Sequence, residues 1–130
     1  MKDKVDLSRT FVHLRDGGDA EPVELTPAFW RECSSGQRTY DRLVGVFEFR
    51  SSEDLHSSMQ EMHPAADELL FLISGAVDVI LQESDTERTV SLAAGQAAIV
   101  RRGVWHRLVM RQAGRLLVIN SRTGMESREA

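Results

Sequence analysis

The sequence is poor in several residue types, and each shortage limits what the chain can be. It has one cysteine, Cys33, among 130 residues, so it cannot form an internal disulfide and suits a reducing cytoplasm. It has only three prolines, and aromatic residues make up 6% of it. Its uncharged stretches, such as 89–100, reach about a dozen residues, whereas a membrane-spanning helix needs about 20. We therefore expect neither a disulfide scaffold nor a membrane-spanning protein.

The chain also lacks a strong charge of either sign. Its 16 basic residues, of which two are lysines, face 20 acidic ones, which gives a net charge of −4. This balance argues against nucleic acid as the main partner. The one basic concentration lacks the repeated aromatic interleaving that stacks bases, so we interpret it as a solvated outer face. It consists of Arg101, Arg102, Arg107, Arg111 and Arg115.

The two ends of the chain and the cysteine add little chemistry. The opening residues 1–6 contain no apolar run, so we expect no secretory signal. Cys33 lies in the stretch Trp-Arg-Glu-Cys-Ser-Ser with no histidine nearby in sequence. A spare buried thiol is therefore a better interpretation of Cys33 than a catalytic nucleophile. The polar tail 121–130 is predicted to be flexible.

What the sequence does have is alternation of apolar and polar residues at a period of two from residue 43 onward. About eight short strands follow one another at intervals of about ten residues, with turn signals between them, a pattern that predicts an all-β sandwich or barrel. One short helix is predicted over 26–32, because Thr26 can cap it and Pro27 suits its first position. We expect an N-terminal segment, 1–42, that packs on a barrel formed by 43–120.

We predict the strands from this alternation and from glycine, proline and polar turn residues. Gly75 is expected to end a strand that is apolar on both faces, and Gly95 and Gly103 mark later turns. The expected strands are 10–14, 44–49, 57–63, 68–74, 77–82, 89–92, 97–100, 105–111 and 115–120.

The residues that carry chemistry gather at two places. Glu61 and His63 are two residues apart on a predicted strand, so their side chains point to the same face. Glu68 begins the next strand after a short loop that contains Pro64, and it can point inward beside them. His106 begins a predicted strand whose inward positions are apolar, and an imidazole buried there needs a polar partner.

The other residues of interest have simpler interpretations. His56 has the opposite parity to Glu61 and His63, so we expect it to face outward. His13 lies in the N-terminal segment, where a surface or packing role is more common. Trp105 is expected to point away from its neighbour His106.

The spacing of these residues resembles the cupin superfamily. Glu61-x-His63, four residues, Glu68, six residues and Gly75 match the first cupin motif except at its first ligand, where the family has histidine. Gly95, five residues, Arg101-x-Gly103, two residues and His106 match the second motif, which has proline where this chain has Arg101. The asparagine that ends the second motif is replaced by Met110. The short spacer of 19 residues between Gly75 and Gly95 is similar to that of small bacterial single-domain cupins.

The resemblance implies a jelly-roll β-barrel with a metal site inside it. The ligands that it implies are His63, Glu68 and His106, with Glu61 where a histidine usually stands. Two imidazoles with one or two carboxylates suit Fe, Mn, Ni or Zn as the divalent ion. Arg101, near the barrel mouth, could bind a substrate carboxylate. Many cupin-like proteins bind no metal, so a barrel without an ion is the alternative.

We therefore predict a small cupin barrel that binds a divalent metal and a small molecule, with an anion among the candidates. A metal-dependent dioxygenase, isomerase or decarboxylase and a non-catalytic binding or sensor module both fit, and the residues do not decide between them. A surface set of Leu69, Phe71 and Ile73 is expected to face outward and to need cover. Small cupins commonly dimerise through their sheets, so we expect a homodimer.

Overall fold

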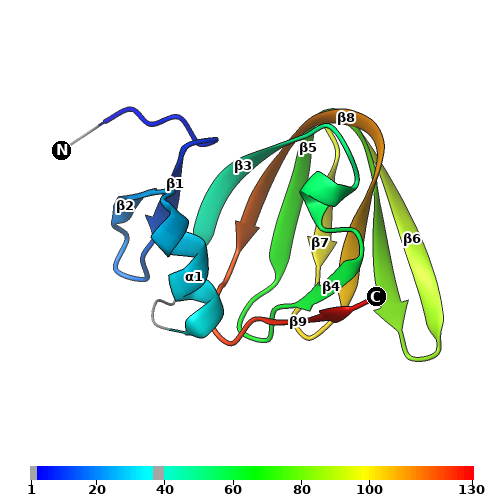
Figure 1. The fold of residues 1–130 in the computed structure, drawn as a ribbon. Helices are drawn as coiled ribbons and strands as arrows, with labels where there is room; N and C mark the ends of the chain where they lie inside the picture. Colours follow the sequence, from blue (N-terminus) through cyan, green and yellow to red (C-terminus); the bar gives the residue numbers. More distant parts are fainter. Residues whose placement is uncertain (1–2, 37–39) are drawn as a thin grey trace.

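The computed structural model describes residues 3–36 and 40–130, and it is built almost entirely from β-strands (Figure 1). This confirms the predicted all-β class. The strands are β1 (Thr10–Leu14), β2 (Ala20–Glu24), β3 (Leu43–Phe49), β4 (Met59–Met62), β5 (Glu68–Glu83), β6 (Thr86–Ala93), β7 (Ala97–Val100), β8 (His106–Asn120) and β9 (Glu126–Glu129). One α-helix, α1 (Pro27–Ser35), and one 3₁₀ turn, η1 (Glu53–Leu55), complete the elements.

The strands form one curled, antiparallel sheet that is not closed. Strand β8 is central to the sheet, because β8 pairs with β3, β4 and β5. The path through the sheet runs β2-β1-β3-β8-β4-β9, and β5 adds β6 and β7 on the other side. In Figure 1, β4 and β9 lie across the front of the barrel and β6 lies at its far edge from α1.

The two longest strands differ from the predicted pattern. The sequence predicts a strand that ends at Gly75 and another that begins at Val77, yet β5 runs unbroken through both. Gly75 adopts a positive φ of 87° and sits among register shifts between β5 and β8, so it bends the strand without ending it. The predicted strands 105–111 and 115–120 are likewise joined in β8.

The barrel interior holds the main hydrophobic core, and α1 covers a second one. Alternate residues of β5, such as Leu70 and Leu72, are buried inside the barrel with Val118 of β8. The second core lies under α1, where Phe11 and Phe29 pack edge to face at 5.8 Å. The helix begins after Thr26 and has Pro27 in its first turn, as the sequence predicts, although the Thr26 side chain makes no capping hydrogen bond. It ends at Gly36, which is in the left-handed conformation.

Two strands were not predicted because they have no apolar alternation. Strand β2 contains Pro22 and lies at the sheet edge, where a missing N–H is tolerated. The fully exposed strand β9 is polar. Strand β9 lies within the predicted tail 121–130 and pairs with β4. The division into 1–42, 43–120 and 121–130 stays a prediction, and no helix within 3–36 or 40–130 is long and apolar enough to cross a membrane.

Candidate metal centre

Three strands bring the predicted site residues together. Glu61 lies on β4, Glu68 is the first residue of β5 and His106 is the first residue of β8, while His63 directly follows β4. Glu61 and His106 are paired directly across the β4–β8 ladder, so their side chains lie on the same face. The exposed fraction of Glu68, His63 and His106 is 3% or less, which places them inside the barrel.

The side chains meet through their nitrogen and carboxylate atoms. His106 Nε2 lies 2.8 Å from Glu68 Oε1, and His63 Nε2 lies 3.3 Å from Glu68 Oε2. Glu61 Oε2 is 3.9 Å from His63 Nε2. One ligand atom each of Glu61, His63 and His106 lies within 4.8 Å of the other two, so this group is able to bind a metal ion. Glu68 touches both histidines, and we call these four residues the metal cluster.

The backbone fixes the tautomer of both histidines. His63 Nδ1 lies 2.9 Å from the carbonyl oxygen of Ser121, and His106 Nδ1 lies 3.1 Å from that of Val104. A carbonyl oxygen only accepts, so each Nδ1 carries a proton and donates it. In the neutral imidazole the other nitrogen, Nε2, then presents a lone pair, and here both lone pairs face the cluster. This anchoring of Nδ1 is typical of histidines that bind metals.

Two buried atoms of the cluster lack a hydrogen-bond partner among the described residues when both imidazoles are neutral. They are His63 Nε2 and Glu68 Oε1, the latter because His106 Nε2, which lies 2.8 Å from it, then carries no proton to donate. Two neutral Nε2 lone pairs opposite a carboxylate repel one another unless a cation lies between them. That cation is either a proton on one imidazole or a metal ion.

The pKa values of Glu68 and His106 also indicate that the cluster favours a cation. Burial alone raises the pKa of the Glu68 carboxyl, but its contacts with His106 and His63 outweigh burial and hold the pKa well below its usual range. Burial lowers the pKa of His106, and its contact with Glu68 more than reverses this and raises it. The Glu68 carboxylate thus favours a positive charge on His106.

Two residues that the sequence analysis did not select support the cluster. Asn120 Nδ2 donates a 2.8 Å hydrogen bond to Glu68 Oε2, and both side chains are buried. Ser121 supplies the carbonyl that anchors His63. A signal for Asn120 was present, since it continues the inward parity of Leu116 and Val118 and is the one polar residue of that series.

The remaining residues of interest lie outside the cluster. Arg101 Nη1 lies 3.2 Å from Asp67 Oδ2, and its side chain is 70% exposed, so the structure does not bring it to the histidines. His56 is exposed, and it caps η1. His13 is buried, and its ring packs edge to face on Tyr40 at 5.1 Å.

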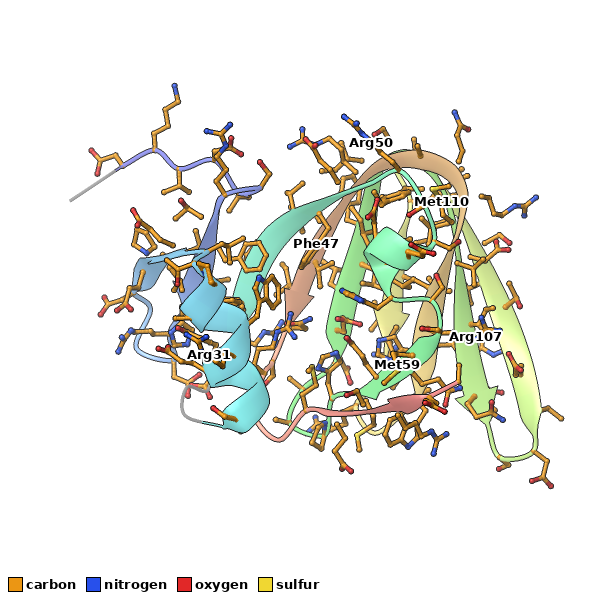
Figure 2. All side chains as sticks on the ribbon, in the orientation of Figure 1. Arg31, Phe47, Arg50, Met59, Arg107 and Met110 are labelled. Atoms are coloured by element: carbon orange, nitrogen blue, oxygen red, sulfur yellow. The ribbon has the colours of Figure 1, made fainter. Side chains whose placement is uncertain are left out.

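Two surface grooves lie outside the cluster as well. One, of about 560 Å³, lies between the N-terminal segment and β3 and is lined in part by Phe11, Trp30 and Phe47. Phe47 belongs to β3 and is labelled in Figure 2. The other, of about 550 Å³, is lined mainly by polar residues, among them Arg107 and Arg128. Neither groove includes a residue of the cluster.

The fold and the cluster together define a class of protein, a β-barrel with a histidine–carboxylate site inside it. Comparison with family models gives the particular family: residues 52–120 match the Cupin domain, and the chain belongs to that family. No curated protein sequence matches the chain.

Solved structures share the fold at low sequence identity. Hydroxypropylphosphonic acid epoxidase from S. wedmorenis is 16% identical with a TM-score of 0.52, over 62% of this chain and 44% of that one. Fe(II) HppE in complex with substrate is 17% identical with a TM-score of 0.51, over 62% and 42%. A cupin superfamily protein from Desulfitobacterium hafniense is 13% identical with a TM-score of 0.50, over 62% and 66%. The chain thus matches less than half the length of the epoxidase.

Proposed function

We propose that this cupin-domain protein binds one divalent transition metal at Glu61, His63, Glu68 and His106, and a small molecule beside the ion. The observation that carries the proposal is the pair of Nε2 lone pairs that face a buried carboxylate with no partner for His63 Nε2 or Glu68 Oε1. A metal ion satisfies all of these atoms at once, whereas a single proton satisfies one imidazole.

The donor set indicates which ions suit the site. Two imidazoles and two carboxylates fit Fe(II), Mn(II), Ni(II) or Zn(II). Glu61 replaces a neutral imidazole by an anion with hard oxygen donors, which favours Mn or Fe over softer ions. The fold's similarity to Fe(II) HppE is consistent with iron.

The exposure of the cluster indicates where a small molecule would reach the ion. The side chain of Glu61 is 36% exposed, whereas those of His63, Glu68 and His106 are at most 4% exposed. Glu61 therefore stands at the open side of the cluster. Further along β8 from His106, the half-buried Leu108 and Met110 pack against the barrel core and offer apolar contacts. An ion bound there would supply Lewis acidity to a donor atom of that molecule.

A binding or sensor role without turnover remains the second candidate, and one observation favours it. The described groups that hydrogen-bond to the cluster are the amide of Asn120 and the carbonyls of Ser121 and Val104, none of which titrates. A proton-transfer step would therefore have to use a cluster residue or the substrate itself. The role predicted for Arg101 in binding an anion stays a prediction, since its guanidinium contacts Asp67.

Elemental analysis tests the metal proposal directly. The protein is loaded with each ion in turn, freed of excess by gel filtration and compared with His63→Ala and His106→Ala. We expect close to one ion per chain for the wild type and strong loss in both variants, because each removes a donor. The matched control is His56→Asn, which removes an exposed histidine at a positive φ of 52° that asparagine tolerates. A wild type that retains no ion overturns the proposal. Metal binding without turnover of diketones, thiols or sugar acids selects the sensor role.

We further propose that two copies of the chain pair through the outer face of β5 and β7. Ile73 and Ile99 are 39% and 53% exposed, and the half-buried Leu69 and Phe71 share their face. An apolar patch of this kind on a small domain is typical of an interface between subunits.

A further inference from the structure

The strand that carries Glu61 has little direct attachment to the barrel. Strand β4 shares one register pair with β8, between Glu61 and His106, and four with β9. Beyond its ends, Ser57 Oγ donates to the Leu108 carbonyl, and Gly103 N donates to the His63 carbonyl at 3.0 Å. The separation of Glu61 from His106 thus depends on what holds β4 against the start of β8.

Arg128 of β9 joins these two strands from outside. Its Nε donates a 2.8 Å hydrogen bond to Gln60 Oε1, and its guanidinium carbon lies 4.0 Å from the centroid of the Trp105 ring. Gln60 directly precedes Glu61, and Trp105 directly precedes His106. Alternate residues of a strand point to opposite faces. Arg128 therefore contacts Gln60 and Trp105 on the outer face, and the next residue of each, Glu61 or His106, is a candidate ligand on the inner face.

The contact differs from those of two arginines on β8. Arg111 and Arg107 lie near carboxylates of neighbouring strands, at 3.5 Å from Asp78 and 3.7 Å from Glu87. Arg128 instead uses a neutral amide and an aromatic face. Gln60 is buried, with 6% of its surface exposed, so loss of Arg128 would leave its amide oxygen without this donor.

We propose that Arg128 is a positioning residue for the metal cluster: it clamps β4 against the start of β8 and so sets the distance between Glu61 and His106. The inference rests on the proposed function, since it assigns to β9 a part in metal affinity. It also explains why Trp105, which faces away from the site, directly precedes a ligand.

The first test is a double-mutant cycle on metal affinity. Zn(II) or Mn(II) affinity is measured by competition with a chromophoric chelator for the wild type, Arg128→Ala, Glu61→Gln and the double variant. We expect Arg128→Ala to weaken binding about tenfold or more, as loss of an outer support of a ligand does. In the Glu61→Gln background it should have little further effect, because Arg128 acts through Glu61. An equal loss in both backgrounds indicates a general structural role and overturns the proposal.

Two further variants test whether the loss of affinity is specific to the contacts of Arg128. Arg128→Lys retains a cation over Trp105 but loses the planar fork, so it should restore part of the affinity. Arg111→Ala, which removes an exposed arginine from the same barrel surface, should leave affinity unchanged. Affinity losses that are equal for Arg111→Ala and Arg128→Ala contradict the clamp.

Hydrogen exchange in the metal-free protein separates the clamp from the proposed function. The amides of Gln60, Glu61 and Met62 should exchange faster in Arg128→Ala than in the wild type, with those of β5 unchanged. Unchanged exchange in β4 overturns the clamp, whatever the metal data show. Faster exchange in a chain whose wild type binds no ion overturns only the proposed function.

Discussion

At the scale of single residues, the cluster is held by groups that cannot change their charge. Backbone carbonyls of Ser121 and Val104 anchor the two imidazoles, and the Asn120 amide anchors Glu68. Each anchor orients a donor atom toward the centre without competing for the ion. The donor atoms are therefore already oriented in the chain without an ion, which would lower the ordering cost of the proposed metal binding.

The Asn120 anchor gives a direct prediction. Replacing Asn120 by Ala should weaken metal binding about 10- to 100-fold, since Glu68 loses the donor that fixes its Oε2. Isothermal titration with Mn(II) or Zn(II) measures this. The control is Gln112→Ala, an exposed amide on the same strand, for which we expect no change. Equal affinities of Asn120→Ala and the wild type would show that Asn120 does not support Glu68.

The shifted pKa values predict how pH affects the stability of the metal-free protein. The pKa of Glu68 is lowered on folding, so its contribution is present above the unfolded value of about 4.3 and is lost as pH falls through the folded pKa. The pKa of His106 is raised, so its contribution is full below about 6.5 and is lost as pH rises through the folded pKa. The pair therefore contributes most between about pH 4.3 and 6.5.

Thermal unfolding in the presence of a chelator measures this window. The wild type should lose stability above the window more steeply than Glu68→Gln, in which the carboxylate that raises the pKa of His106 is gone. Parallel pH profiles of the two proteins would contradict the assigned coupling.

At the scale of elements, the barrel depends on one close crossing between its longest strands. A Cβ on Gly75 would lie 2.6 Å from the carbonyl oxygens of Gln112 and Ala113. A Cβ on Gly114 would overlap the backbone of Ser74. These contacts are with backbone rather than with flexible side chains, so only glycine fits where β5 bends over β8.

Gly114→Ala should therefore destabilise the protein by about 1–3 kcal/mol, the usual cost of forcing extra atoms into a packed site. Urea denaturation monitored by circular dichroism measures the free energy of unfolding. Gly17→Ala is the matched control, because a Cβ at Gly17 meets no atom within 4 Å. A Gly114→Ala variant as stable as Gly17→Ala would show that the two strands can separate there at little cost.

At the scale of the whole molecule, the outer face of β5 and β7 should control assembly. Ile99→Lys places a charge at the most exposed large hydrophobic side chain of the described residues, and it should shift the proposed dimer toward monomer. Analytical ultracentrifugation measures the change, and Arg101→Ala, at an exposed position just after β7, serves as the control. Metal content should stay the same, since the cluster lies inside the barrel. A wild type that sediments as a monomer overturns the proposed dimer.

The sequence by itself determined the features that depend on local spacing. The alternation of apolar and polar residues predicted the all-β class. Thr26 and Pro27 predicted where the helix begins, and the spacing of Glu61 and His63 predicted that their side chains share one face of a strand. That His106 approaches Glu68 was expected only because the spacing of the two stretches resembles the cupin motifs.

The tertiary structure decided what depends on partners far apart in the chain. Whether Gly75 ends a strand or bends it depends on the β8 backbone beside it, which no local pattern encodes. Strand β9 forms because β4 offers it an edge to pair with, although its own residues are all polar and exposed. Asn120 meets Glu68 across 52 residues of sequence, and Arg128 meets Gln60 across 68. Hydrogen bonds over such separations follow from the packing of the whole sheet, so only the folded chain shows them.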